Sequence, residues 1–527
     1  MAEPTVQDAW RTELELPALP LGELPRRAAR RWPDRAALIS GDRVVTFAGL
    51  EERVRALAAA VAGAVPAGGV VGVVTVLDPV FAGAYYGAAR AGRPVVTLNP
   101  FLRGEALLRI LTRSHARLAF LTGEAAERLA PHRAQLPELT VVVTDAEAGD
   151  APKETVALPD FLAAAPDACA EDGDAAAPAL EATACLHFTS GTTGAPKAVR
   201  LSHRALTANA AQTGHAQGLD ESSVTLNQLP LFHIMHLNSA LWAGATQVLC
   251  TDGDPAAAVQ AADAHGATHW FSIPMRLARM AADPGLTALR PRTLRGIFCG
   301  GSALRADVAE KLGAHFGFPV VQGYGLAEAS PTVTLDLPHR PRPGSCGPAV
   351  AGTGVRVVDV DGRQVLGAGQ KGEIQIRGPQ LMTGYAGSET GEDVGTDGWF
   401  STGDVGHLDE DGYLFLSDRL GDVFKCDHEL VAPADVEEVL LAHEAVADCV
   451  VFGMPDGLSG AVPHGLVVLR DGAEAGQVMA AVNRELAPFE RLRRLEAVTE
   501  VPRSPGGKVQ RHLLRDRAAA APDNRPR

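Results

Sequence analysis

Two kinds of segment alternate between residues 52 and 98 and limit the fold. The periodicity of 52–62 and 79–91 predicts two helices, whereas the continuous apolar runs 70–77 and 94–98 predict two buried strands. Buried strands that alternate with helices are typical of parallel α/β layers. A second stretch of the same kind follows at 182–335, so the sequence predicts an α/β fold with two α/β subdomains.

The remainder of the chain departs from this pattern. Period-two alternation broken by Asp-Gly and Gly across 355–385 predicts a small antiparallel β subdomain. Residues 145–180 are rich in Ala, Asp, Glu and Pro, which indicates a surface excursion. A short α+β module is expected after Asp418, and 518–527 is predicted to be a disordered tail. A chain of 527 residues is too long for one hydrophobic core, which agrees with several domains.

The composition, together with the lack of a recognisable targeting signal, predicts a cytoplasmic protein that binds neither a membrane nor a nucleic acid. The apolar run 56–77 is interrupted by Pro66, Gly68 and Gly69, so a helix, a turn and a strand are favoured over a membrane span. No signal peptide is recognisable, and a net charge of −15 opposes nucleic-acid binding. The cysteines form no CxxC pair, which indicates reduced thiols: Cys169, Cys185, Cys250, Cys299, Cys346, Cys426 and Cys449.

The segment 188–197, FTSGTTGAPK, predicts a loop that holds a polyphosphate. Its two glycines allow a tight turn close to a ligand, its hydroxyl groups donate hydrogen bonds, and its lysine supplies a cation. The pattern differs from the Walker loop, in which the lysine directly follows the second glycine. The residues concerned are Ser190, Gly191, Thr192, Thr193, Gly194 and Lys197.

Further motifs follow this loop in a fixed order. They are LPLFH at 229–233, CGGSAL at 299–304, QGYGLAE at 322–328, GEIQIRGPQLMTGY at 372–385, WFSTGDVGHLDEDGYLFLSDR at 399–419 and PRSPGGKVQR at 502–511. With these motifs the chain resembles the adenylate-forming superfamily, which includes acyl- and aryl-CoA synthetases, peptide-synthetase adenylation domains and firefly luciferase. The resemblance covers nearly the whole sequence.

The resemblance implies an N-terminal adenylation domain over 1–417, a hinge at 418–421 and a mobile C-terminal cap over 422–517. It also implies two half-reactions. In the first, a small acid attacks the α-phosphorus of ATP and forms its AMP anhydride with release of pyrophosphate. In the second, an acceptor, usually the thiol of CoA, displaces AMP.

The resemblance also assigns roles to individual residues. Lys508 matches the lysine that meets the attacking carboxylate and the α-phosphate, and Lys425 matches the lysine that assists thioester formation. His233 matches the gate between the ATP and acid sites, and Glu328 matches the carboxylate that positions Mg²⁺.

For the nucleotide, the resemblance implies that Asp404 and Arg419 hold the ribose and that Tyr324 brackets the adenine. The backbone near the adenine is expected to come from two motifs, with candidate residues Gly300, Gly301, Ser302, Gln322, Gly323 and Gly325. His236 stands where the family usually has a small residue, so we expect it to enter the acid pocket and favour a short or aromatic acid. Trp270 and Phe271 are interpreted as core residues.

Three positions depart from the family pattern. Ala327 replaces the threonine whose hydroxyl meets the α-phosphate, Gly421 stands at the hinge pivot, and His428 replaces a glycine that lines the CoA channel. These departures leave open a ligase that transfers to CoA or another acceptor, and an ATP-dependent diazotase that activates nitrite for attack by an aromatic amine without CoA. A non-catalytic scaffold is disfavoured because Lys508 and Glu328 are retained. The sequence does not distinguish a monomer from a homodimer.

Overall fold

The computed structural model describes residues 14–165, 177–189, 197–361, 363–387, 394–395, 397–427, 429–456, 458–470, 472–503, 509 and 511–520. The chain divides into two compact units, and both are discontinuous in sequence. The first comprises Met1–Gly354 and Arg377–Phe400, and the second comprises Val355–Ile376 and Ser401–Arg527.

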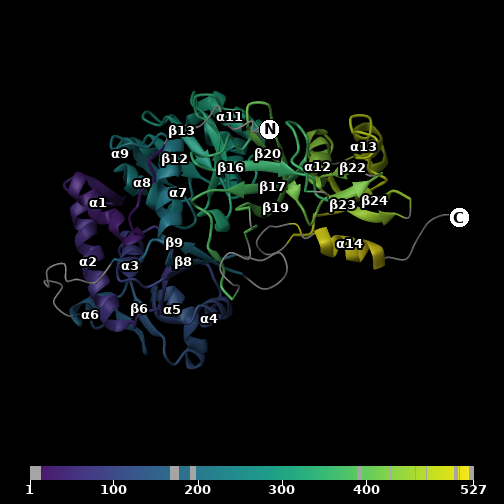
Figure 1. Cartoon of the computed structure of the whole chain (residues 1–527). Helices are drawn as coiled ribbons and strands as arrows, with labels where there is room; N and C mark the ends of the chain where they lie inside the picture. Colours follow the sequence, from purple (N-terminus) through teal and green to yellow (C-terminus); the bar gives the residue numbers. More distant parts are fainter. Residues whose placement is uncertain are drawn as a thin grey trace. The chain divides into compact units, whose positions relative to one another are not determined.

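The first unit contains two eight-stranded sheets (Figure 1). One sheet has the order β18-β9-β8-β4-β3-β5-β6-β7, and its strands from β3 to β8 pair in parallel, whereas β9 pairs antiparallel with β8 and β18. Its members are β3 (Val70–Val74), β4 (Val95–Leu98), β5 (Ala116–Leu121), β6 (Thr140–Val143), β7 (Val156–Ala157), β8 (Thr183–Phe188), β9 (Ala198–Ser202) and β18 (Gly384–Tyr385).

The other sheet has the order β15-β14-β13-β12-β10-β11-β1-β2. Its six central strands are parallel, and the edge strands β15 and β2 are antiparallel to their neighbours. Its members are β1 (Ala36–Ser40), β2 (Arg43–Thr46), β10 (Val224–Asn227), β11 (Thr246–Leu249), β12 (His269–Ser272), β13 (Gly296–Cys299), β14 (Val320–Gly325) and β15 (Thr332–Leu335). The predicted pair of parallel α/β subdomains is confirmed.

Helices connect these strands. They are η2 (Leu21–Glu23), α1 (Leu24–Arg31), α2 (Phe47–Ala64), α3 (Pro79–Arg90), α4 (Gly104–Arg113), α5 (Gly123–Leu129), η3 (Ala130–Gln135), α6 (Leu158–Ala163), α7 (His203–Ala216), α8 (Ile234–Ala243), α9 (Pro255–His265), α10 (Pro274–Ala282), η4 (Pro284–Ala288), α11 (Ala306–Phe316) and η5 (Ala327–Ala329).

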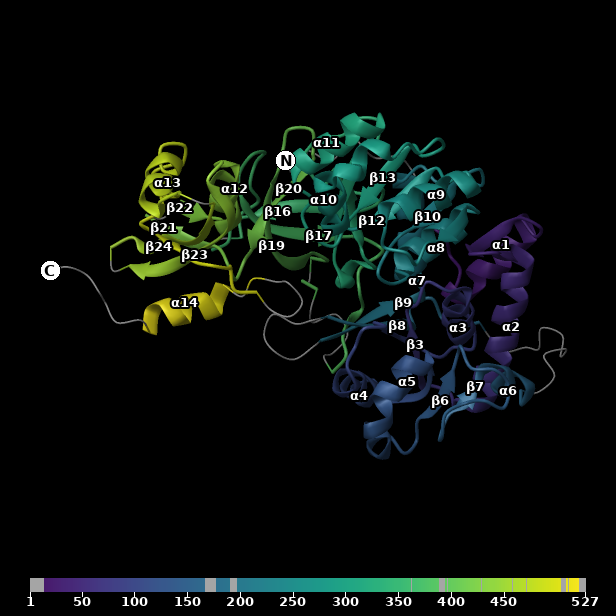
Figure 2. The ribbon, with the colours of Figure 1, turned by 180° about the vertical axis from the view of Figure 1, so that it is seen from behind.

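The run 56–77 folds as predicted, with the end of α2, a turn, and the fully buried strand β3. Helices α2 and α3 lie side by side in both views (Figures 1 and 2). Two glycines on α3 permit this close contact, because a Cβ atom at Gly83 or Gly87 would lie 2.9 or 2.7 Å from the Leu57 side chain. In the part of the chain that the structure describes, no helix is long and apolar enough to cross a membrane.

The part of 145–180 that the structure describes, residues 145–165 and 177–180, is more ordered than the sequence predicts. Instead of a plain surface excursion it contains β7, which pairs in parallel with β6, and the short helix α6. A proline in the first turn suits the start of this helix. The ring of Phe161 packs edge-on against Phe120 at 5.7 Å, which buries α6 against the first sheet.

The second unit also contains two sheets. The smaller sheet confirms the predicted β subdomain, with order β16-β17-β19-β20, and the larger has the order β22-β21-β24-β23 with β25 beside β24. The strands are β16 (Gly354–Val358), β17 (Gly372–Arg377), β19 (Phe400–Leu408), β20 (Leu414–Arg419), β21 (Phe424–Cys426), β22 (Glu429–Val431), β23 (Val446–Asp456), β24 (Gly460–Leu469) and β25 (Arg494–Ala497). The helices are α12 (Pro433–Ala442), α13 (Ala475–Val482) and α14 (Arg511–Ala520).

The predictions for the C-terminal tail and for the cysteines can also be compared with the structure. Helix α14 continues to Ala520, three residues into the expected tail, and 521–527 lie outside the described residues. Cys169 also lies outside them, and the other six cysteines are free and buried.

Gly347 provides a test of the packing beside β15. A Cβ atom there would lie 2.1 Å from the Leu335 carbonyl oxygen, whereas at Gly344 it would meet nothing within 4 Å, although both residues have φ near 80°. We expect Gly344→Ala to lower the free energy of unfolding by about 1–2 kcal/mol through backbone strain. Gly347→Ala should add an overpacking cost of about 1–3 kcal/mol.

Urea unfolding followed by tryptophan fluorescence measures both variants, because all five tryptophans belong to the first unit: Trp10, Trp32, Trp242, Trp270 and Trp399. Equal losses in the two variants would contradict the predicted clash with Leu335.

Candidate active site

A cavity of about 400 Å³ lies within the first unit, at the carboxyl ends of parallel strands. Residues that line it directly follow or end β10, β12, β13 and β14, and His187 reaches it from β8 in the other sheet. The carboxyl edge of a parallel sheet is where α/β proteins bind ligands. The volume falls in the range of about 300–1,000 Å³ that holds small organic molecules.

Glycines from two predicted motifs form one part of the wall, together with the buried ring of Tyr324. Gly300 and Gly301 follow β13, and Gly301 has a φ of 88°. Gly323 and Gly325 permit close approach of β14 to β15, since an added Cβ would lie 2.9 Å from the Thr334 oxygen or 2.5 Å from the Pro331 oxygen. This wall therefore depends on residues without side chains.

Two other residues predicted to contact the nucleotide do not line this cavity. Ser302 is exposed on the loop after β13. Gln322 is buried, and its side chain accepts a hydrogen bond from the backbone nitrogen of Leu304 at 2.9 Å and donates one to the Ser345 oxygen at 3.0 Å. The side chain of Gln322 therefore joins the two loops beside the cavity instead of facing into it.

Three histidines surround the cavity, of which His236 is buried and His187 and His233 are half-buried. His233 precedes α8, and its Nδ1 accepts a hydrogen bond from the backbone nitrogen of Met235 at 3.2 Å. Burial, followed by the nearby His187, lowers the pKa of His233 to about 4. Burial also lowers the pKa of His187 and of His236. At neutral pH the cavity therefore contains uncharged imidazoles.

His236, which the sequence predicts to enter the acid pocket, lines the cavity. Its ring stacks on Phe271 with centroids 4.0 Å apart and an interplanar angle of 23°. Phe271 and Trp270 belong to hydrophobic core clusters, which agrees with their predicted core role.

Glu328 and Lys197 are brought together by Tyr385. The Tyr385 hydroxyl donates to Glu328 Oε1 at 2.8 Å, and the Lys197 Nζ atom lies 4.5 Å from the centre of the same ring. This arrangement results from the antiparallel pairing of β18 with β9, in which Tyr385 lies opposite Val199. Ser190, Gly191, Thr192, Thr193 and Gly194, all predicted to bind phosphate, lie outside the described residues.

Asp404 and Arg419 belong to the second unit. They lie opposite one another on β19 and β20, and the Arg419 Nε atom is 2.7 Å from Asp404 Oδ1. Asp404 is buried, whereas the Arg419 side chain is 59% exposed. The guanidinium group therefore remains accessible while it holds the carboxylate.

Lys425, also in the second unit, lies on β21 and forms an ion pair with Asp361. The hydrogen bond to that carboxylate raises the pKa of Lys425. Lys508 and His428 lie outside the described residues.

Comparison with known proteins decides the family. The family model described as "AMP-binding enzyme" matches residues 25–386, and the model described as "AMP-binding enzyme C-terminal domain" matches 435–508. The chain is an AMP-binding enzyme. The predicted resemblance to the adenylate-forming superfamily and the predicted class of AMP-forming ligase are thereby confirmed.

Relatives of this AMP-binding enzyme include 4-coumarate–CoA ligase 3 of Oryza sativa subsp. japonica, which is 32% identical over 84% of this chain and 81% of its own. Among solved structures, the anthranilate CoA ligase AuaEII in complex with anthranoyl-AMP has a TM-score of 0.82 and 25% identity, with 96% and 99% of the two chains covered. The O-succinylbenzoate coenzyme A synthetase of Bacillus subtilis, in complex with ATP and magnesium ion, has a TM-score of 0.78 and 27% identity, with 94% and 99% covered. These comparisons give no support to the diazotase alternative.

The residues of the AMP-binding enzyme also permit a test for magnesium. Among the described residues no group of three or more His, Cys, Asp or Glu side chains could hold a metal ion. Magnesium in nucleotide sites is bound through one or two carboxylates, phosphate oxygens and water. The single carboxylate of Glu328, held by Tyr385, fits this kind of site and does not fit an all-protein metal cage.

Sequence reasoning missed four residues of the site. Tyr385 ends a motif used only for the resemblance, and its link to Glu328 requires the β18–β9 pairing. His187, Gln217 and Ser272 line the cavity from three separate elements, and no local pattern in the sequence distinguishes them from core residues.

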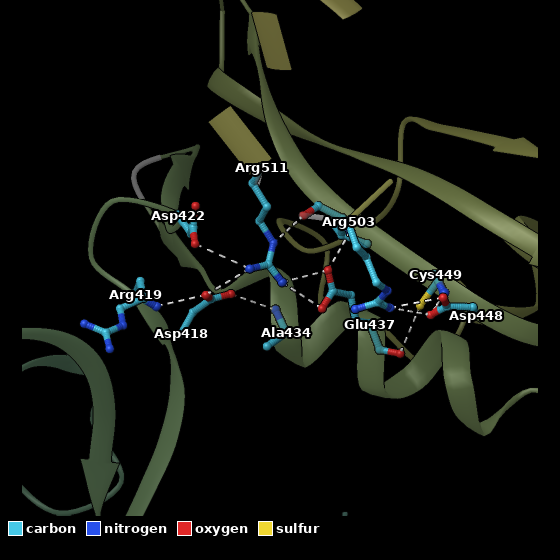
Figure 3. A network of polar contacts seen from close by, with 10 residues as sticks. Asp418, Arg419, Asp422, Ala434, Glu437, Asp448, Cys449, Arg503 and Arg511 are labelled. Atoms are coloured by element: carbon cyan, nitrogen blue, oxygen red, sulfur yellow. Dashed lines mark hydrogen bonds and ion pairs between the residues drawn. The ribbon is translucent and has the colours of Figure 1, made fainter. Parts of the chain in front are cut away.

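Arg511 lies at the centre of a buried ion-pair network in the second unit (Figure 3). Both of its terminal nitrogens contact carboxylates: Nη2 lies 2.8 Å from each oxygen of Glu437, and Nη1 lies 3.4 Å from Asp418 and 3.5 Å from Asp422. The Nε atom donates to the Val451 oxygen at 3.0 Å. Through these contacts the first residue of α14 is joined to the end of β20, where the hinge is predicted.

Burial sets the electrostatics of this network. It raises the pKa of Asp418 and of Glu437, and the charge of Arg511 partly offsets both shifts. Burial acts to lower the pKa of Arg511, but the charges of Glu437 and Asp418 outweigh it and the net shift is upward. Removal of the guanidinium group would leave two buried carboxylates without their main cation.

We expect Arg511→Met to lower the free energy of unfolding of the second unit by about 3–5 kcal/mol, the usual cost of breaking a buried ion pair from one side. The matched control is Arg503→Met, because Arg503 also contacts both oxygens of a carboxylate, Asp448, but is 41% exposed. An exposed pair of this kind contributes about 0–1 kcal/mol.

The loss in Arg511→Met should shrink as pH falls. A carboxyl group whose pKa is raised in the folded state binds more protons when folded than when unfolded, so its unfavourable effect shrinks as pH falls through the folded-state pKa and is gone below the unfolded-state pKa. Urea unfolding followed by far-UV circular dichroism measures the change, while tryptophan fluorescence reports the first unit alone. Equal losses in the Arg511 and Arg503 variants would contradict the role given to burial.

Proposed function

We propose that this AMP-binding enzyme activates a small aromatic acid as its AMP anhydride and then transfers the acyl group to the thiol of CoA. The observation that supports this most directly is the cavity, which is lined both by the strand-end glycines and by the imidazoles of His233 and His236. The rings of His236, Phe298 and Tyr324 line this cavity and give it an aromatic wall. The relatives of this chain include a 4-coumarate–CoA ligase and an anthranilate CoA ligase, which agrees with an aryl substrate.

In the proposed first half-reaction, a carboxylate oxygen of the acid bonds to the α-phosphorus of ATP. The bond from this phosphorus to the bridging oxygen of the β-phosphate breaks, and pyrophosphate leaves. This chemistry depends on positioning and charge neutralisation. Lys197 and the loop of Ser190, Gly191, Thr192, Thr193 and Gly194 would hold the β- and γ-phosphates, and Lys508 would neutralise charge at the reacting centre.

His233 would orient the acid without exchanging a proton. Because Nδ1 accepts from Met235, the neutral ring carries its proton on Nε2 and can donate it in a hydrogen bond. A pKa of about 4 keeps the ring uncharged at neutral pH. The acid carboxylate then keeps the negative charge that makes it a nucleophile.

Glu328 would hold the metal that accompanies ATP. Magnesium, when bound, neutralises phosphate charge and offers oxygen coordination to the nucleotide. Tyr385 fixes one Glu328 oxygen by its hydrogen bond, so the role of Tyr385 is to orient the carboxylate.

The remaining roles concern the ribose and the second half-reaction. Asp404 would accept hydrogen bonds from the ribose hydroxyls, with Arg419 beside it. In the second step the CoA thiol gives up its proton to water and its sulfur bonds to the acyl carbon, the bond from that carbon to the AMP oxygen breaks, and AMP leaves. Lys425 would assist this step. We also propose a cytoplasmic location, which the six buried free cysteines support.

The division of work between the two lysines can be tested. Lys508→Ala should lower the rate of acid-dependent pyrophosphate release about 100- to 1,000-fold, as the loss of a preorganised donor does, while ATP still binds. Lys425→Ala should leave pyrophosphate release near the unmutated rate and lower the rate of thioester formation. A coupled pyrophosphate assay and chromatography of the CoA product measure the two steps. Unchanged pyrophosphate release in Lys508→Ala would remove that residue from its role.

A substitution at Ala327 is expected to raise the rate of adenylate formation, whereas the lysine substitutions lower a rate. Ala327 lines the cavity at the start of η5, where the family has a threonine. If a hydroxyl there meets the α-phosphate, Ala327→Thr should speed adenylate formation about 10- to 100-fold, the value of one hydrogen bond to a charged group. Ala327→Val, which has the same shape without the hydroxyl, is the control. Equal rates in the two variants would exclude this contribution of the hydroxyl.

A further inference from the structure

Three residues that line the cavity each carry a buried polar atom without a hydrogen-bond partner in the protein. The atoms are Oε1 of Gln217, Nδ1 of His236 and Oγ of Ser272. Their residues are deeply buried, with exposed fractions of 4%, 9% and 3%. Buried polar atoms are almost always paired, and an unpaired one is costly, so three around a single cavity require an explanation.

Three hydroxyl side chains that line the same cavity are satisfied by the protein. The hydroxyl of Thr213 donates to Thr332 at 2.9 Å, that of Thr334 to the Cys346 oxygen at 2.7 Å, and that of Ser330 to the Gln380 oxygen at 2.9 Å. Among the described residues that line the cavity, some polar side chains are thus paired within the protein, whereas Gln217, His236 and Ser272 each keep an unpaired atom.

The three residues come from separate parts of the fold. Gln217 is the C-cap of α7, His236 lies in the first turn of α8, and Ser272 is the last residue of β12. The wall beside them is apolar and includes Leu229, Phe298 and Leu335. A ligand in this part of the cavity is thus mainly surrounded by carbon and meets a few polar atoms, which is how proteins select a substituted ring.

The chemistry of these atoms restricts the ligand. The amide oxygen of Gln217 only accepts, so its partner must donate. The hydroxyl of Ser272 and the neutral ring of His236 can each donate or accept a hydrogen bond. Both can therefore bind a ligand group that donates one hydrogen bond and accepts another. A ring hydroxyl or amino group meets these requirements, whereas a methyl group or a halogen does not donate.

We infer that Gln217, His236 and Ser272 determine specificity for an aromatic acid that carries a hydroxyl or amino group on its ring. This inference rests on the proposed function, because it assigns the cavity to the acid. A site built to hydrogen-bond a substituent rejects the analogue that lacks it, since its own polar atoms then remain unpaired.

The test compares matched acids and matched variants. The acids are benzoates and cinnamates that carry a hydroxyl, an amino or a methyl group at the same ring position, each assayed by ATP-dependent pyrophosphate release. We expect kcat/KM for the best hydroxyl or amino acid to exceed that of its methyl analogue by about tenfold or more, the effect of one buried hydrogen bond. The variants Gln217→Leu, His236→Phe and Ser272→Ala should each reduce this ratio, and at least one should bring it to about one.

The methyl acids also control for folding, because a variant that still turns them over is intact. Ser272→Ala removes a single oxygen atom and is the mildest of the three changes. Equal kcat/KM for the hydroxyl, amino and methyl acids in the unmutated enzyme would overturn this inference and leave the proposed function standing, as would ratios that no variant changes. The absence of pyrophosphate release with every acid would overturn the proposed function and this inference with it.

Discussion

Parallel pairing is the constraint on which the site depends. Strands β10, β12, β13 and β14 run side by side in one direction, so their carboxyl ends and the loops that follow them meet at one edge. The strands are buried apolar segments and carry little chemistry themselves. Reactive groups can therefore gather only where the strands stop, and the cavity lies there. The glycines at these ends let backbone replace side chains in the wall.

The sequence predicted the layers because segments with helical periodicity alternate with continuous apolar runs, and it offered candidate site residues because they stand in specified motifs. The failures have physical reasons. Segment 145–180 is rich in Ala, Asp, Glu and Pro, and its helix packs on the first sheet partly through the contact of Phe161 with Phe120, which lies far away in the sequence. Tyr385 becomes part of the site only through its pairing with β9.

A polar residue type did not reveal by itself which way its side chain faces. Gln322 and Gln217 illustrate the point. The first stands in a recognised motif, yet its amide is used to join two loops. The second stands in an ordinary helix end, yet it lines the cavity with an unpaired oxygen. Hydrogen-bond partners separated by many residues decide such cases, and they emerge only in the folded chain.

The two units interrupt one another along the chain, and this has a consequence for biosynthesis. Strand β18 belongs to a sheet whose other strands end by Ser202, yet it is made only after 355–376, which belong to the second unit. During translation β9 is therefore an open edge, with unpaired backbone groups, for more than a third of the chain length. No single cleavage of the polypeptide separates the two units as complete pieces. The first sheet has all of its strands only when synthesis has passed Tyr385.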